Sequence, residues 1–256
     1  MNTITKKMKR MPLKEDFDRP YTTVDVVIFS LIDEQLQVLL VQRPAKKTDP
    51  YPGAWALPGG YVDVAIDKDL LACANRKLTE KTGVVSPYLE QLGSWGGKSR
   101  DRRHRWTTTH VYFALITVDA KSLNPGGNSQ TLSWFPVKAW EYKKERELAF
   151  DHAEILDVAI DRLRSKVEYT SLPAYLLNEP FSLPQLQQAY EQVLDRKIDK
   201  SGFRTRALSQ TNFLEEVGEM DVGAPMLAKG YKIQGRKQNK VQYFPRTLGR
   251  QKSEVS

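Results

Sequence analysis

The chain has 256 residues, of which 40% are hydrophobic and 27% are charged, and its formal net charge is +8. This composition is typical of a soluble globular protein with one large domain or two smaller ones, and no apolar run approaches the roughly 18 residues of a membrane-spanning helix. The first 20 residues lack the apolar segment of a signal peptide, and the single cysteine, Cys73, cannot form an intrachain disulfide. We therefore expect a cytoplasmic protein without membrane contact, in which Cys73 is a buried thiol.

The first 150 residues carry the pattern of an α/β domain. Residues 1–20 have no hydrophobic period and predict a flexible basic arm. Strands are predicted at Thr22–Ser30, Leu36–Arg43, Trp106–Thr117 and Thr131–Phe135, the first two as a hairpin. A helix is predicted over Asp67–Thr82, where Leu70, Leu71, Ala74 and Leu78 recur at helical spacing and Gly83 supplies the stop. Strands on either side of one central helix indicate an α/β/α sandwich over residues 21–150.

After residue 150 the pattern becomes helical. Asp151 predicts the start of a connecting helix over 151–170, and Ser182 with Gln185 forms a capping box. The further predicted helices are Ser171–Leu177, Ser182–Leu194 and Lys200–Thr211, and a hairpin of Lys229–Gln234 and Val241–Phe244 follows around a basic tip at 235–240. This order predicts a winged helix-turn-helix over 171–248, with a tail at 249–256.

Basic residues concentrate near the C-terminus. From Arg196 to Lys252 there are thirteen lysines and arginines against five acidic residues, which suggests a polyanionic partner such as double-stranded DNA. The Lys200–Thr211 helix is the candidate for reading bases, with Phe203, Ala207 and Leu208 facing inward. The expected DNA contacts are Lys200, Arg204, Thr205 and Arg206 on this helix and Arg236, Lys237 and Lys240 at the wing tip. The alternatives are a basic tail that aids solubility and a winged helix used for protein contacts.

The predicted helix at 67–82 contains an altered motif. LPGG at 57–60, followed by RKLTEKTGV from Arg76, resembles the Nudix box, G-x5-E-x7-R-E-U-x-E-E-x-G-U with U aliphatic. In this alignment Lys77 and Lys81 replace two glutamates, Glu80 remains, and Lys68 stands at the upstream glutamate. Asp63 or Asp67 is the alternative for that upstream carboxylate, because the segment between Gly60 and Arg76 is about two residues longer than usual.

The two lysines reverse the charge that this chemistry needs. The resemblance implies pyrophosphate hydrolysis with a divalent metal, and magnesium takes hard oxygen ligands. Positions 77 and 81 lie one helical turn apart, so two ammonium groups share the face where the family gathers carboxylates. We expect no catalytic residues and no metal at the degenerate positions Arg76, Lys77, Glu80 and Lys81. Lys77 and Lys81 are predicted to hold a diphosphate instead, as counter-charges. Magnesium would be needed only if the chain is an active hydrolase.

A second basic segment lies between two predicted strands. GGKSRDRRHRW, residues 96–106, carries five lysines or arginines and resembles the R-D-x-R stretch of Nudix proteins that handle ADP-ribose. Arginine binds phosphate with two parallel hydrogen bonds, and Trp55, Tyr61 or Trp106 could stack on a base. The residues expected to bind this nucleotide effector are Arg43, Trp55, Gly59, Gly60, Tyr61, Arg76, Lys77, Lys81, Arg102, Arg103 and Arg105.

Together with LAFDHAEIL at 148–156, these segments resemble the Nudix-related transcriptional regulators of NAD metabolism, the NrtR type. The resemblance implies a homodimeric DNA-binding repressor of genes for NAD biosynthesis or salvage, with ADP-ribose or a related nucleotide as effector and no required cofactor. The alternative is an active ADP-ribose or nucleotide-sugar pyrophosphatase with an accessory basic domain. A third interpretation is an RNA-associated hydrolase of capped 5′ ends. The operator, the exact effector and the direction of its effect are left open by the sequence.

Overall fold

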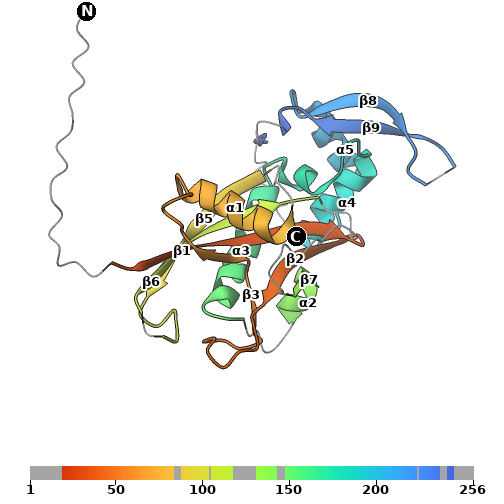
Figure 1. The fold of residues 1–256 in the computed structure, drawn as a ribbon. Coiled ribbons are helices and arrows are strands. Elements are labelled where there is room, and N and C mark those ends of the chain that lie inside the picture. The colour runs from red at the N-terminus through yellow and green to blue at the C-terminus, as the bar shows by residue number, and fades with distance from the viewer. Residues whose placement is uncertain are drawn as a thin grey trace, which may run out of the picture.

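A computed structural model describes residues 19–83, 88–103, 105–117, 131–142, 148–223, 225–236 and 241–244. Residues 1–18 of the predicted arm, His104, Lys237, Lys240 and the tail at 249–256 lie outside the described residues. Figure 1 shows a sheet with helices about it and, at one end, a smaller helical part that carries a hairpin. Within the described ranges no helix is both long and apolar enough to cross a bilayer.

Seven strands of the described residues form one mixed sheet, in which the central path runs β3-β2-β1-β6-β5. β1 (Tyr21–Ile32) pairs antiparallel with β2 (Gln35–Gln42) and parallel with β6 (Thr107–Leu115), so the predicted hairpin and the strand after the arginine-rich loop are confirmed. The remaining strands are β3 (Trp55–Ala56), β4 (Gly59–Tyr61), β5 (Tyr88–Gly97) and β7 (Leu132–Pro136). β5 and the short helix α2 (Val137–Tyr142) had not been predicted.

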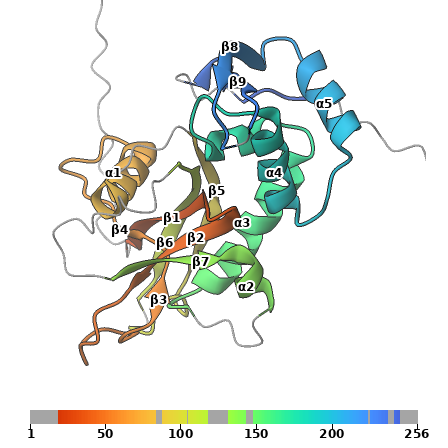
Figure 2. The same ribbon diagram turned by 90° about the vertical axis from the view of Figure 1, so that its right-hand side faces the viewer.

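The sheet is covered on both faces. Val24, Val26 and Ile28 of β1 point to one face and pack with Cys73, Ala74 and Leu78 of α1 (Leu70–Thr82), whereas Val27 and Phe29 point to the other face, toward α3 (His152–Val167). This alternation is the period of a strand buried on both sides. Figure 2 shows α1 and α3 on opposite sides of the sheet, which confirms the predicted α/β/α sandwich.

Helix α1 begins three residues later than predicted. Asp69 caps it by accepting a hydrogen bond from the Ala72 N–H at 2.7 Å, and Gly83 ends it with φ +68°. Asp67 lies before the helix, where its carboxylate is held by Arg76. Leu71, expected to be buried, is exposed, since the helix packs on the sheet by its other face.

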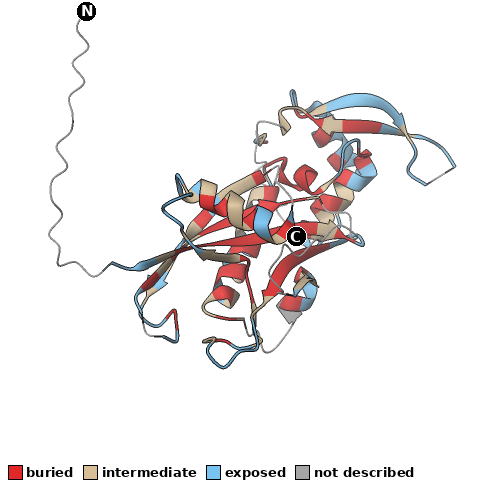
Figure 3. Ribbon diagram, viewed as in Figure 1, coloured by how far each residue is buried: buried red, intermediate tan, exposed pale blue. Residues whose placement is uncertain are grey.

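The second part follows α3 and contains η1 (Leu172–Leu176), α4 (Leu183–Leu194), α5 (Lys200–Ser209), β8 (Leu214–Met220) and β9 (Ala228–Ile233). The capping box of Ser182 and Gln185 is present at the start of α4, and α5 ends two residues before the predicted Thr211. Three helical segments and an antiparallel hairpin make a winged helix-turn-helix. One continuous cluster of buried residues joins Phe29 and Phe113 of the sheet to Ile155 of α3 and to Leu186 and Phe203 of this part. Figure 3 shows buried segments in both the sheet and this part.

Candidate functional site

Arg76 organises the acidic residues of the altered box. Its Nε and Nη2 donate to the two carboxylate oxygens of Asp67 at 2.7 and 2.6 Å, and its Nη1 donates to Glu80 Oε1 at 2.8 Å. These hydrogen bonds lower the pKa of Asp67 and raise that of Arg76. Both carboxylates near the box are therefore engaged by a guanidinium, and Asp63, the other alternative, accepts from the Ala65 N–H.

The two substituted lysines lie on the same side of α1. The Lys77 Nζ is 3.6 Å from Glu80 Oε2, and a Cβ on Gly60 would lie 3.2 Å from that Nζ. Burial lowers the pKa of Lys81, and Lys77 lowers it further while Glu80 opposes the shift. Burial raises the pKa of Glu80, but Arg76 and Lys77 outweigh it and lower the pKa below its usual range. Among the described residues no three His, Cys, Asp or Glu side chains gather where they could hold a metal ion.

The glycine pair at 59–60 lies beside the Lys77 side chain. β4 pairs with β1 through Gly59 opposite Asp25 and Gly60 opposite Val24. A Cβ on Gly59 would lie 2.7 Å from the Val24 carbonyl oxygen and still closer to the Asp25 carboxylate, and Gly60 has φ +148°. Both positions therefore require glycine, and the missing side chain at Gly60 leaves room for the Lys77 ammonium.

The loop at 98–105 places its outward arginines on tyrosines. Arg103 binds the Asp101 carboxylate and donates to the Tyr61 hydroxyl at 3.1 Å, while the Arg105 guanidinium lies 5.2 Å from the centre of the Tyr21 ring. Tyr21 and Tyr61 contact each other edge to face at 6.0 Å, and both are nearly half exposed. In the same loop Arg102 lies over the ring of Tyr51 at 4.6 Å. The loop thus brings guanidinium groups and exposed aromatic rings beside β4.

Arg43 reaches the same region from the end of β2. Its guanidinium makes two hydrogen bonds to Asp49, at 2.8 and 2.7 Å, and lies 4.9 Å from the centre of the Phe150 ring. Trp55 has a different surrounding: its ring packs edge to face on Phe135 at 4.9 Å, at the border of the hydrophobic core. Of the residues expected to bind the nucleotide, Trp55 is the one that packs against the core.

Sequence reasoning missed the residue of this loop that turns inward. The Arg100 side chain is 5% exposed and donates to Asp25 Oδ2 at 2.8 Å and to Asp151 Oδ2 at 2.9 Å. Burial would raise the pKa of Asp25, but His152, Arg100 and Thr109 outweigh it and lower the pKa to about 2. Tyr21, Tyr51 and Phe150 were also missed. The alternation of strands could have marked Asp25 as a buried carboxylate in need of a cation, whereas no periodic signal distinguishes Arg100 from its neighbours.

Helix α5 presents the residues expected to contact DNA. Asp199 caps it by accepting from the Gly202 N–H at 2.6 Å, and Phe203 and Ala207 are buried as predicted. Lys200, Arg204 and Thr205 are exposed. Arg206 is exposed too, but it donates to the Glu168 carbonyl at 2.7 Å and lies over the Phe244 ring. The prediction for Leu208 was wrong: it is 46% exposed, because α5 packs through a narrow face formed by Phe203 and Ala207.

The predicted wing was placed wrongly. The hairpin consists of β8 and β9, and the segment expected to form its basic tip, residues 235–240, begins after β9 has ended. Arg236 is mostly buried; it lies 3.2 Å from Glu179 and donates to the Ala174 and Tyr175 carbonyls, so the structure contradicts its assignment to an exposed tip. The observed wing carries the acidic residues Glu215, Glu216, Glu219 and Asp221, and its only lysines, Lys229 and Lys232, pair with Glu216 and Glu215.

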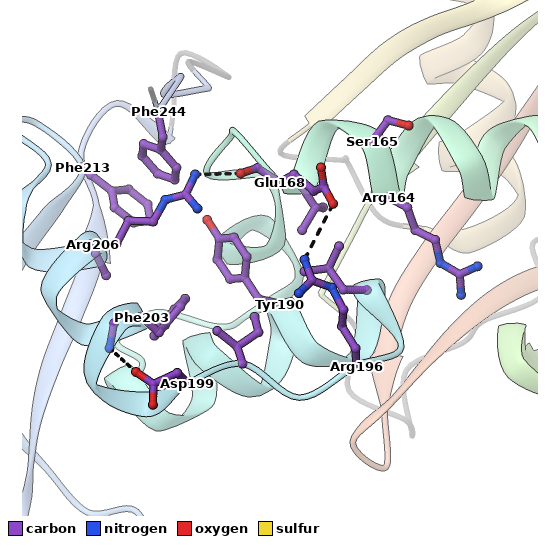
Figure 4. Close-up of a pocket in the computed structure, with 15 residues that line it drawn as sticks. Arg164, Ser165, Glu168, Tyr190, Arg196, Asp199, Phe203, Arg206, Phe213 and Phe244 are labelled. Atoms are coloured by element: carbon purple, nitrogen blue, oxygen red, sulfur yellow. Dashed lines mark hydrogen bonds and ion pairs between the residues drawn. The ribbon is translucent and has the colours of Figure 1, made fainter. Parts of the chain in front are cut away.

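A groove of about 920 Å³ lies between the C-terminal half of α3 and the α4–α5 pair. Figure 4 shows Tyr190, Phe203 and Phe244 along it, with Arg196 paired to Glu168 across it at 3.6 Å. The arginines that line it are bound to protein groups: Arg164 donates to the Val193 carbonyl and Arg206 to that of Glu168. The groove therefore lies at the junction of the two parts, away from the box.

Two family models match the chain. Residues 21–158 match the NUDIX domain, and residues 173–233 match the NrtR DNA-binding winged helix domain. A relative from Acinetobacter baylyi, described as an ADPR responsive transcriptional repressor NtrR, is 40% identical over 220 residues, which are 86% of this chain and 84% of the relative.

Two solved structures of NrtR from Shewanella oneidensis are similar to this chain. The structure complexed with a 27mer DNA has a TM-score of 0.74 and 35% identity, and it matches 89% of this chain and 99% of the other. The structure of the NUDIX domain complexed with ADP ribose has a TM-score of 0.51 and 38% identity, over 59% of this chain and 94% of the other. The sandwich and the winged helix thus each match a structure that holds a ligand.

Proposed function

Since this chain belongs to the Nudix family and, within it, to the regulators with an NrtR winged helix domain, we propose that it is a transcriptional repressor that binds operator DNA and responds to ADP-ribose. The observation that carries this proposal is the 40% identity to an ADPR-responsive repressor, because it extends through 86% of the chain and so includes both parts. A hydrolase acting on a small nucleotide has no need of a winged helix.

We propose that the diphosphate of the effector lies over Gly60, between the box lysines and the outward arginines of the 98–105 loop. The Lys77 ammonium already lies beside Gly60, and Tyr61 next to it accepts a hydrogen bond from Arg103. Arg43 and Arg103 each hold a carboxylate that a phosphate can replace with the same paired geometry. The exposed rings of Tyr21 and Tyr61 offer a stacking surface for a base.

We propose further that the effector is retained rather than cleaved. Magnesium needs several hard oxygens, and the residues present do not fit it, because Arg76 binds both Asp67 and Glu80 and Lys77 adds a cation beside them. Two unit charges of the same sign at about 4 Å repel by roughly 4 kcal/mol at an effective dielectric constant near 20, and more when one is divalent. The alternative, an active pyrophosphatase, has the Nudix match in its favour.

The remaining parts of the proposal follow from the role of such a regulator. We propose that the chain works in the cytoplasm, because a DNA-binding repressor acts where the chromosome is. A homodimer would set two α5 helices against two half-sites about one helical turn apart. Genes of NAD biosynthesis or salvage are the proposed targets, since ADP-ribose is a product of NAD breakdown.

One experiment tests the function directly. Fluorescence anisotropy would follow the binding of a labelled duplex from the region upstream of the chain's own gene, at low salt and with increasing ADP-ribose. We expect the duplex to be bound at low salt, where phosphate contacts are strongest, and the affinity for it to change with ADP-ribose. No DNA binding at low salt would contradict the regulator, and AMP release from ADP-ribose with magnesium or manganese at an ordinary enzymatic rate would favour the pyrophosphatase.

A further inference from the structure

The arginine loop and helix α3 are joined by a buried ion-pair network. Arg100 comes from the loop, Asp25 from the central strand β1, and Asp151 from the position just before α3. On this geometry, and resting on the proposed function, we propose that Arg100 is a positioning residue that transmits occupancy of the effector site to α3 and so to the winged helix domain. The ion pair of Arg100 with Asp151 connects the arginine loop to the start of α3.

Asp151 is oriented for this link rather than for its own helix. An aspartate at a helix N-cap ordinarily accepts a hydrogen bond from a backbone N–H of the first turn. Asp151 occupies the N-cap of α3 but makes no such side-chain bond, and its Oδ2 accepts from Arg100 instead. The first turn of α3 is thus held by the loop, so a displacement of Arg100 acts directly on the start of the helix.

The network is not saturated. The His152 Nδ1 accepts a hydrogen bond from the Leu57 N–H at 2.9 Å, and its Nε2 lies 3.4 Å from Asp25 Oδ2. Asp151 Oδ1, within the described part of the chain, is buried without a hydrogen-bond partner. An unused acceptor leaves room for a second pairing of the same groups, which a switch between two arrangements requires.

The residue before Asp151 is also constrained by the effector region. Phe150 has φ +60°, a left-handed conformation that side chains rarely adopt. Its ring is held by the Tyr51 ring at 4.5 Å and lies under the guanidinium groups of Arg43 and Arg100, at 4.9 and 5.6 Å. Contacts from three segments that border the effector site therefore hold Phe150, just before α3, in a strained backbone conformation.

On the loop side, Arg100 is connected to the proposed effector site. Arg100 is followed by Asp101, whose buried carboxylate binds Arg103, and the Arg100 carbonyl accepts a hydrogen bond from the Tyr51 hydroxyl at 3.2 Å. A phosphate that binds Arg103 competes with Asp101 for the same guanidinium. Since Asp101 is adjacent to Arg100 in the chain, this competition acts on the residue that holds α3.

Helix α3 continues the link to the DNA-binding part. Its 16 residues span about 24 Å, and its last turns pack in the same core as α4. The Arg164 Nε donates to the Val193 carbonyl of α4 at 3.0 Å, and α5 follows α4 after a short turn. Figure 1 shows α3 running from the sheet to the winged helix part. A shift at the start of α3 therefore displaces α4 and α5, because the helix moves as a rigid unit.

The test is the variant Asp151→Asn. It leaves Arg100 paired with Asp25, so no buried charge is stranded. Calorimetry gives the Kd for ADP-ribose, and anisotropy gives the Kd for the operator with and without saturating ADP-ribose. We expect both basal affinities to stay near those of the unmodified chain, while the coupling factor, typically between about 5 and 150 in allosteric proteins, falls toward 1.

The control is Glu90→Gln, which removes the partly buried ion pairs of Glu90 in β5 with Arg162 and Lys166 of the same helix, away from the loop. We expect it to keep the coupling factor. Loss of coupling in Glu90→Gln as well would mean that any loosening of α3 suffices and would overturn the proposal, as would an unchanged factor in Asp151→Asn. If the unmodified chain binds no ADP-ribose or shows no coupling, the proposed function falls together with this inference.

A second measurement does not depend on a variant. Hydrogen–deuterium exchange of the full chain, with and without ADP-ribose, reports the protection of the first turn of α3, where the Ile155 N–H donates to the Asp151 carbonyl. We expect ADP-ribose to change the exchange of this turn and of residues 98–103. Changed exchange in the loop with unchanged exchange in α3 would overturn the proposal.

Discussion

Gly59 shows how closely the backbone approaches a buried charge. A Cβ at this position would lie 2.7 Å from the Val24 carbonyl, and the Asp25 carboxylate beside it is held by Arg100 and Thr109. We expect Gly59→Ala to lower the free energy of unfolding by at least about 2 kcal/mol, because neither neighbour can move aside. Urea denaturation followed by circular dichroism measures this loss. Gly93→Ala is the control, since its Cβ meets only the Trp95 ring, at 3.2 Å, and an equal loss there would contradict the explanation.

Reversing the charge of Lys77 tests whether the sign of the charge at this position decides if the site retains a nucleotide or cleaves it. The Lys77 ammonium lies beside Gly60, where we propose that the diphosphate binds. In the absence of metal, Lys77→Glu should weaken ADP-ribose binding at least tenfold, which is about 1.4 kcal/mol, and it should create a measurable affinity for manganese. Calorimetry in EDTA and then in manganese gives both values. Lys197→Glu, which makes the same charge change beyond the sandwich, should leave both unaltered; unchanged binding in Lys77→Glu would place the diphosphate elsewhere.

At the scale of elements, α5 and the wing have opposite electrostatic character. α5 exposes Lys200 and Arg204, whereas the lysines of the wing are paired with glutamates of β8. Arg204→Ala should therefore weaken operator binding and reduce the slope of log K against log salt by about 1 if Arg204 contacts a phosphate. Lys232→Ala, which removes the partner of Glu215, should leave the slope unchanged. Anisotropy titrations between low and moderate salt measure both slopes, and an equal reduction in Lys232→Ala would show that the wing also contacts phosphate.

The sequence predicted those elements that have an apolar face. The apolar run in Thr22–Ser30 and the helical spacing of Leu70, Ala74 and Leu78 are both set by burial against a core, so both are visible in the sequence. β8 reads LEEVGEM and is exposed along most of its length; it is held by cross-strand pairs such as Glu215 with Lys232, which leave no period. For the same reason the basic segment at 235–240 was mistaken for the wing tip.

The candidate site could be predicted in composition but not in arrangement. The box lysines and the arginine-rich loop were identified as basic segments, and they do lie near β4. Which arginine turns inward depends on Asp25 and Asp151, which are 75 and 51 residues away from Arg100 in the chain. Such pairings are set by tertiary packing, and no local pattern in one sequence encodes them. The side-chain roles in effector binding therefore stay predictions.

At the scale of the whole molecule, the two parts share one core. The cluster that contains Phe113 of the sheet also contains Leu163 of α3 and Leu186 of α4, so neither part can unfold without exposing the apolar surface of the other. We expect a single cooperative transition in urea. All five tryptophans precede residue 150, so their fluorescence reports mainly on the sandwich, while far-ultraviolet circular dichroism follows the helices of both parts. Coincident transitions are expected, and two separated midpoints would contradict the shared core.

The sole cysteine lies deep between α1 and the sheet. Burial raises the pKa of the Cys73 thiol to about 11, with a further contribution from Asp67, so at neutral pH it stays protonated and unreactive. Maleimide dyes would accordingly find no target on the native surface. A cysteine introduced on the wing or on α5 becomes a unique labelling point, and a single fluorophore can then report encounters with an operator in real time.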